Sequence, residues 1–193
     1  LLALPATLLA VSNASSPTAT KAALVYGLSL VFLLSASAIY HTPTWTPKVR
    51  MWLRRVDHLA IFVLIAGSYT PICLLALPGQ AGRTLLLLVW SFAGAGALLS
   101  LAWPTAPRWL NLGLAIAMGC SVVPFGATFV SALGGASLAL IIIGGLLYII
   151  GGVAYARRRP DPMPTIFGYH EIFHCLVLAA VVCHYLAFWR LMT

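Results

Sequence analysis

Long apolar runs, joined by short polar segments, constrain this chain more than any other feature of its sequence. A helix needs about 20 mostly apolar residues to cross the hydrocarbon core of a bilayer. Lipid offers no hydrogen-bond partners, so a segment that crosses it must satisfy its own backbone, as a helix does. We therefore expect an all-α membrane protein, a seven-transmembrane helix bundle in one domain over residues 1–193, with its first helix truncated. The predicted spans lie near residues 1–11 (partial), 22–41, 56–77, 84–102, 109–130, 136–156 and 166–189.

The composition also indicates a membrane protein. Hydrophobic residues make up 62% of the chain and charged residues 7%, whereas soluble domains carry about 25% charged residues. The net charge of +8 does not indicate nucleic-acid binding, because the Lys and Arg residues lie in short loops, where they orient transmembrane helices. We expect no nucleic-acid partner. Short loops are typical of a multi-pass protein of the plasma membrane, here a bacterial inner membrane.

The distribution of Lys and Arg predicts the orientation of the helices. Loops that would share one side of the membrane carry eight basic residues, and the other side carries three, Lys21, Arg83 and Arg190. Cytoplasmic loops are enriched in Lys and Arg, so this split places the N-terminus in the cytoplasm. The eight residues are Lys48, Arg50, Arg54, Arg55, Arg108, Arg157, Arg158 and Arg159.

The few ionisable residues near the ends of the apolar runs are the best candidates for function. A charged side chain at the centre of a membrane helix costs roughly 2.5–3.5 kcal/mol on insertion scales, so such residues mark functional sites by default. His41 ends the second run, Asp57 begins the third, and His170 and His174 begin the last. All four residues fall on the predicted cytoplasmic side.

The spacing of these residues predicts a metal site. Residues four apart share one face of a helix, so His170 and His174 can point into the bundle together, and Ser37 lies one turn deeper than His41. Three imidazoles with an open fourth position are typical of a catalytic zinc, which lowers the pKa of a bound water toward ~7. Asp57 would orient or deprotonate that water, and Ser37 would hydrogen-bond to it or polarise the substrate.

Three segments carry a family resemblance over essentially the whole chain. They are S-A-S-A-I-Y-H (35–41), R-V-D-H-L-A-I-F-V-L-I-A-G-S-Y-T-P (55–71) and F-G-Y-H-E-I-F-H (167–174). The chain resembles the haemolysin III branch of the PAQR family, which also contains the adiponectin and progestin receptors. The resemblance implies seven helices, a cytoplasmic N-terminus and a zinc bound near the cytoplasm by His41, His170 and His174. It places Asp57 and Ser37 at or beside the zinc-bound water.

Three functions are compatible with these features. The wider superfamily includes alkaline ceramidases, which implies a zinc-dependent hydrolase of a lipid amide or ester bond, with Asp57 as base and Ser37 assisting the oxyanion. A receptor or regulator of membrane state would bind a lipid without turnover. A cytolytic pore is what the name of the branch implies, although helices nearly devoid of charge argue against a wide channel.

The remaining polar residues have simpler interpretations. His58 projects about 100° away from Asp57 around the helix, so a bond to a neighbouring group is favoured over a ligand role. His184 lies ten residues beyond His174, roughly 15 Å along the axis, so we expect it to pair with another polar group. For Glu171, acceptance of an imidazole N–H and pairing with the Arg157–Arg159 cluster are equally favoured.

Proline and glycine predict local geometry within the spans. Pro71 and Pro124 interrupt apolar runs and should kink their helices, because proline lacks a backbone donor. Small residues let neighbouring membrane helices approach closely. We assign this packing role to Gly94, Gly96, Gly144, Gly145, Gly151 and Gly152.

Overall fold

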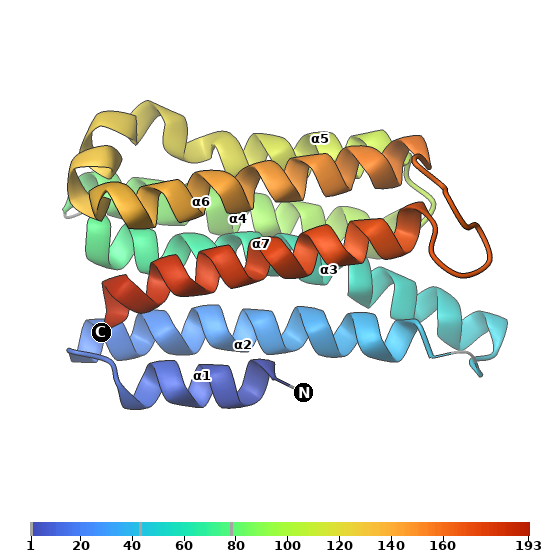
Figure 1. Ribbon diagram of the computed structural model, residues 1–193, viewed down its shortest axis with the longest axis horizontal. Helices are drawn as coiled ribbons and strands as arrows, with labels where there is room; N and C mark the ends of the chain where they lie inside the picture. The colour runs from blue at the N-terminus through green and yellow to red at the C-terminus, as the bar shows by residue number, and fades with distance from the viewer. Residues whose placement is uncertain (1, 43, 78) are drawn as a thin grey trace.

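The computed structural model describes residues 2–42, 44–77 and 79–193, and it is helical over most of them (Figure 1). Within these ranges the only β-type pairing is an isolated bridge between Met163 and Phe167. The predicted all-α class is confirmed. The elements are α1 (Ala3–Ser12), α2 (Pro17–Tyr40), α3 (Pro47–Pro71), η1 (Ile72–Ala76), α4 (Gln80–Ala102), α5 (Arg108–Gly119), η2 (Cys120–Phe125), α6 (Gly126–Arg157) and α7 (Tyr169–Met192).

Five helical stretches are long and apolar enough to cross a membrane, with mean hydropathies from 2.0 to 2.3 over their most apolar windows. The chain is thus a multi-pass membrane protein. A sixth helix, α1, is apolar but only 10 residues long. The five stretches are Pro17–Tyr40, Pro47–Ala76, Gln80–Ala102, Arg108–Arg157 and Tyr169–Met192.

Two helices begin well before the apolar runs that predict them. α2 begins at Pro17, although the span predicted for it begins near residue 22. α3 begins at Pro47, although the span predicted for it begins near residue 56. In each case a hydroxyl caps the helix: Ser16 accepts from the backbone N–H of Ala19, and Thr46 accepts from that of Val49. Proline at the first helical position has its φ already set for a helix, so capping chemistry rather than hydropathy decides these starts.

The stretch Arg108–Arg157 is too long for one crossing, because 50 residues of helix would span roughly 75 Å against a hydrocarbon core of about 30 Å. Figure 1 shows the chain turning back on itself between α5 and the long part of α6. The break falls at Gly134, with φ 68° and ψ 156°, a backbone conformation that glycine adopts without a steric penalty. The predicted boundary between spans 109–130 and 136–156 therefore coincides with this break.

Pro71 and Pro124 lie where the helix changes its winding. α3 ends at Pro71 and continues as the π-helix η1, and Pro124 lies within the 3₁₀-helix η2. A proline inside a helix removes one backbone donor, and a change of winding reorganises the neighbouring hydrogen bonds. The winding therefore changes at Pro71 and Pro124, while the kinks predicted there stay predictions.

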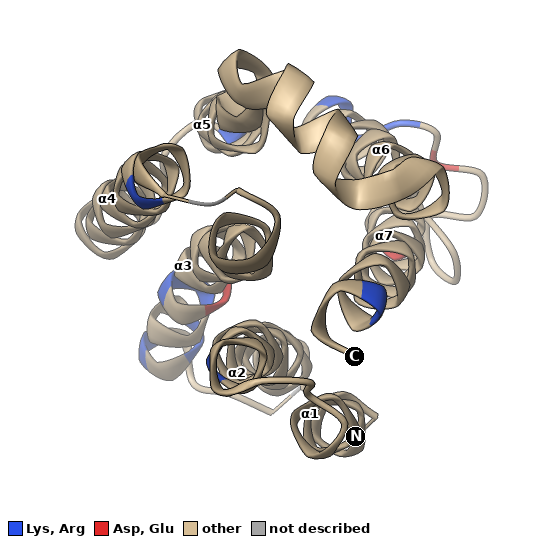
Figure 2. Ribbon diagram, turned by 90° about the vertical axis from the view of Figure 1, so that its left-hand side faces the viewer, with Lys and Arg blue, Asp and Glu red and all other residues tan. Residues whose placement is uncertain are grey.

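The packing of the bundle places two helix ends side by side. Seen end-on, α1 lies outside against α2, while α3 lies further inside (Figure 2). α7 packs mainly on α6 and also touches α2, α3 and η1. The C-terminal end of α2 and the N-terminal end of α7 lie at the same end of the bundle (Figure 1), so residues 129 positions apart can meet there.

Only some of the glycines have the predicted packing role. A Cβ on buried Gly96 would lie 2.6 Å from the ring of Phe62, so the absence of a side chain lets α4 approach α3. Nothing lies within 4 Å of the Cβ position of Gly94 or Gly145, and the packing role predicted for these two is wrong. Gly94 is exposed on the outside of the bundle.

This contrast predicts a difference in stability between two variants of α4. Gly96→Ala places a methyl group against the Phe62 ring, and overpacking of this kind typically costs about 1–3 kcal/mol. Gly94→Ala adds a methyl group in open space and gains helix propensity. Thermal unfolding in detergent should show a lower midpoint for Gly96→Ala than for Gly94→Ala. Equal midpoints would contradict the close approach of α3 and α4 at this point.

Candidate metal centre

Three histidines from two helix ends form the candidate site. His41 is the residue that follows the last turn of α2, and its backbone N–H donates to the carbonyl of Ser37. His170 and His174 lie one turn apart at the start of α7. His41 is exposed, whereas His170 and His174 are half-buried, so the group lies at the mouth of the bundle.

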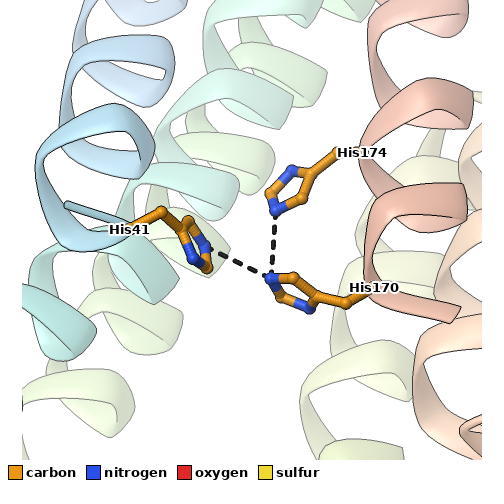
Figure 3. Close-up of side chains that lie close together, drawn as sticks. All are labelled: His41, His170 and His174. Atoms are coloured by element: carbon orange, nitrogen blue, oxygen red, sulfur yellow. Dashed lines mark hydrogen bonds between the residues drawn. The ribbon is translucent and has the colours of Figure 1, made fainter. Parts of the chain in front are cut away.

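The three rings point toward one another (Figure 3). The Nε2 atoms of His170 and His174 are 3.1 Å apart, and the Nε2 atoms of His170 and His41 are 3.3 Å apart. The ring centroids of the three pairs are separated by 4.6–5.0 Å. One ligand atom from each histidine lies within 4.8 Å of the other two.

The separations of the His170 Nε2 atom from those of His174 and His41 are close to what a tetrahedral metal ion requires. With metal–nitrogen bonds of about 2.0–2.1 Å, the nitrogens of a tetrahedral zinc site lie about 3.3–3.4 Å apart. Neutral imidazole carries a donor on one nitrogen and a lone pair on the other, so three converging Nε2 atoms cannot all satisfy one another. The donor set could hold one divalent ion and leave a fourth coordination position open.

Two carboxylates fix the start of α7 and hence the position of His170. A carboxylate oxygen of Glu171 accepts from the backbone N–H of Gly168 at 2.8 Å, and Asp161 accepts from that of Tyr169 at 3.1 Å. Both bonds satisfy N–H groups at a helix start, which otherwise lack partners. Glu171 thus caps its own helix. This role differs from the two expected from the sequence, acceptance of an imidazole N–H and pairing with the Arg157–Arg159 cluster.

The electrostatic environment favours the form of His41 that binds metal. Partial burial and the neighbouring charge of His170 lower the pKa of His41 from its ordinary value of 6.5. The imidazole is therefore neutral at neutral pH, and a neutral imidazole is the form that coordinates a metal ion.

Asp57 and Ser37 lie together but outside the group of converging nitrogens. Asp57 is half-buried in α3 and lies near Ser37 of α2. Among the described residues, the ligand atoms that lie within 4.8 Å of one another belong to the three histidines, and Asp57 is not a member of that group. Asp57 is therefore not brought together with the three histidines as a fourth ligand.

The two other histidines bond to backbone carbonyls. The Nδ1 atom of His58 lies 2.7 Å from the carbonyl oxygen of Arg54, and the Nε2 atom of His184 lies 3.2 Å from that of Ile141. The expectation that neither joins the cluster is confirmed.

An aromatic and cationic wall beside His170 was not predicted from the sequence. The Tyr155 ring lies 5.7 Å from the His170 ring, and the Arg108 guanidinium stacks 4.4 Å above Tyr155. Arg108 also donates to the backbone carbonyl of Tyr155 at 3.0 Å. These residues come from α5 and α6 and are 47 positions apart, so no local motif could have linked them.

Comparison with known proteins identifies a family that covers nearly the whole chain. The sequence model of the family described as "Haemolysin-III related" matches residues 1–185. The chain is 33% identical over 154 residues to "Hemolysin-3 homolog" of Bacillus subtilis, covering 80% of this chain and 69% of that protein. It is 30% identical over 181 residues to "Hemolysin-3" of Bacillus cereus, covering 92% of this chain and 80% of that protein.

A more distant similarity reaches animal receptors. The chain is 29% identical over 195 aligned positions to "Adiponectin receptor protein" of Drosophila melanogaster, covering 91% of this chain and 44% of that protein. The family match includes His41, directly after α2, and the part of α7 that carries His170 and His174. On these similarities, the chain belongs to the haemolysin III branch of the PAQR family.

Proposed function

We propose that this protein is a zinc-dependent membrane hydrolase that cleaves an amide or ester bond of a membrane lipid. The observation that carries the proposal is the convergence of three Nε2 atoms from His41, His170 and His174 at one end of an apolar bundle. Zinc suits imidazole ligands, and three imidazoles with an open position are typical of catalytic rather than structural zinc. When bound, the ion supplies a Lewis acid that polarises a carbonyl and activates water.

The side chains of α2 and α3 supply the remaining chemistry. In our proposal Asp57 takes a proton from the attacking water as the new carbon–oxygen bond forms, and the proton then passes to the departing amine or alcohol. The Ser37 hydroxyl lies beside Asp57 and, in our proposal, donates its single proton toward the developing oxyanion. General bases of this kind contribute about 10²–10⁴-fold to a rate.

The depth of the site favours a lipid substrate. The three histidines lie where apolar helices end and polar loops begin, which is the depth of lipid headgroups. The amide and ester bonds of membrane lipids lie between the headgroup and the acyl chains, so a lipid that enters laterally would bring such a bond to the cluster.

We further propose seven membrane passes with the N-terminus in the cytoplasm, in a bacterial plasma membrane. The reversal at Gly134 divides the stretch Arg108–Arg157 into two passes, and α1 adds a partial one. The eight-to-three distribution of Lys and Arg supports a cytoplasmic location for the histidine cluster.

Two other functions have support in the names of relatives. "Hemolysin-3" of Bacillus cereus suggests a cytolytic protein, and "Adiponectin receptor protein" of Drosophila suggests a receptor without turnover. The pair Ser37 and Asp57 favours the hydrolase, because a zinc that only ties helices together needs no carboxylate beside it.

The first test is metal content. We expect the purified protein to carry about one zinc ion per chain and His174→Ala to lose it, because two nitrogens cannot hold the ion. His58→Ala is the matched control, since His58 lies at the same end of the bundle but bonds to the Arg54 carbonyl. Elemental analysis by mass spectrometry gives the measurement. Equal zinc in both variants would disprove the three-histidine centre.

The second test is turnover. Vesicles containing a ceramide or a phosphatidylglycerol with a fluorescent acyl chain should release labelled fatty acid, and Asp57→Asn should slow release by about 10²–10⁴-fold. Zinc content and thermal stability should stay close to wild type. Dye leakage from the vesicles that Asp57→Asn does not change would favour cytolysis. The absence of both product and leakage would favour the receptor.

The third test is topology. In a background that lacks Cys73, Cys120, Cys175 and Cys183, a membrane-impermeant maleimide should label Gln80→Cys on intact cells. Met163→Cys, in the loop before α7, should react only after the cells are permeabilised. Both positions are exposed. The opposite pattern would mean that the histidine cluster faces the outside.

A further inference from the structure

A second group of polar side chains lies within the bundle, away from the metal centre. It consists of Tyr26 on α2, Tyr148 on α6 and His184 on α7, and we call it the Tyr–His cluster. His184 is ten residues beyond His174, which places it roughly 15 Å deeper along the helix axis. The cluster is therefore separate from the three converging imidazoles.

The orientation of the His184 ring is fixed by two neighbours. Gly144 leaves room for it, since a Cβ there would lie 2.6 Å from the Nε2 atom. That same Nε2 atom lies 3.2 Å from the carbonyl oxygen of Ile141. A carbonyl oxygen only accepts, so Nε2 carries the proton, and in the neutral ring Nδ1 is a bare acceptor.

Two buried polar atoms in this cluster have no partner among the described residues. They are the Nδ1 atom of His184 and the hydroxyl of Tyr26, a residue that is 2% exposed. Both rings pack on Phe188, with centroid distances of 4.9 Å for Tyr26 and 5.6 Å for His184. Tyr148 packs edge-on against His184 at 5.3 Å. Buried polar groups without partners are rare in proteins and unfavourable.

The chemistry of the two atoms selects what could satisfy them. Nδ1 needs a donor, and the Tyr26 hydroxyl, once it donates, needs an acceptor. A single O–H group that reached both atoms would satisfy both. A carboxylate has no proton to give to Nδ1, and an ammonium has no lone pair to accept from Tyr26, so ionised groups do not fit.

We propose that Tyr26, Tyr148 and His184 form a second binding site that takes a neutral O–H group inside the membrane. The hydrogen of that group is donated to Nδ1 of His184, and its oxygen accepts from the Tyr26 hydroxyl. Two sources share this chemistry, a single internal water and the hydroxyl end of a lipid. The Tyr148 ring forms one wall of the site.

The sign of a stability change tests the proposal. Removing an orphaned hydroxyl should leave the protein as stable or make it more stable, whereas removing one that holds a ligand should destabilise it. We expect Tyr26→Phe to lower the unfolding temperature by a few degrees. Tyr185→Phe is the matched control for the loss of a bonded hydroxyl, because Tyr185 donates to the Ala6 carbonyl at 2.8 Å. An unchanged or higher unfolding temperature for Tyr26→Phe would overturn the proposal.

The two sources are separated by adding 1-decanol or its methyl ether to the delipidated protein. If a lipid hydroxyl is the ligand, decanol should raise the unfolding temperature of wild type but not of Tyr26→Phe, and the ether should have no effect. If water is the ligand, neither probe should act, while Tyr26→Phe still destabilises.

A measurement on the unmodified chain tests the site without depending on whether Tyr26→Phe folds. In protein labelled with ¹⁵N-histidine, the Nδ1 resonance of His184, assigned by its loss in His184→Gln, should show an accepted hydrogen bond. A resonance typical of a bare nitrogen would refute the site.

Discussion

The structure depends on one property of its surroundings: lipid neither hydrogen-bonds to a backbone nor hydrates a charge. Helices satisfy the backbone, and several serine and threonine hydroxyls within the spans donate to carbonyls of their own helices. Ser68 donates to the carbonyl of Leu64, Thr70 to that of Ala66 and Ser100 to that of Gly96, each one turn earlier. With ordinary polar groups satisfied in this way, a polar group that lacks such a partner becomes informative.

The five histidines show this distinction. His58 and His184 each bond to a carbonyl, as a structural histidine in a helix bundle does. His41, His170 and His174 instead bring their Nε2 atoms toward one another. The same criterion identifies the Tyr–His cluster, where one nitrogen and one hydroxyl stay without partners in the described chain. Both sites are therefore inferred from the arrangement of donors and acceptors.

The candidate metal centre lies between two helices, α2 and α7, that have only a small packing contact with each other. α7 packs extensively on α6, while its contact with α2 is limited. A metal held by His41 on one side and by His170 and His174 on the other would tie the end of α2 to the start of α7. Because metal binding then contributes to the folded state, the mouth of the bundle and the site would form together, with Asp57 of α3 beside them.

The sequence by itself determined the all-α class, most of the apolar spans and the collection of His41, Asp57, His170 and His174 at one end, because hydropathy and i, i+4 spacing are local properties. Only the tertiary structure decided the 3.1 and 3.3 Å separations of the Nε2 atoms, the position of Asp57 outside their group and the Arg108–Tyr155 wall beside His170. It alone separated Gly96, which packs on Phe62, from Gly94, which faces outward. The physical reason is that the interior of the bundle and the surrounding lipid are both apolar, so the sequence pattern shows which residues share a helix face but not which face meets a neighbouring helix.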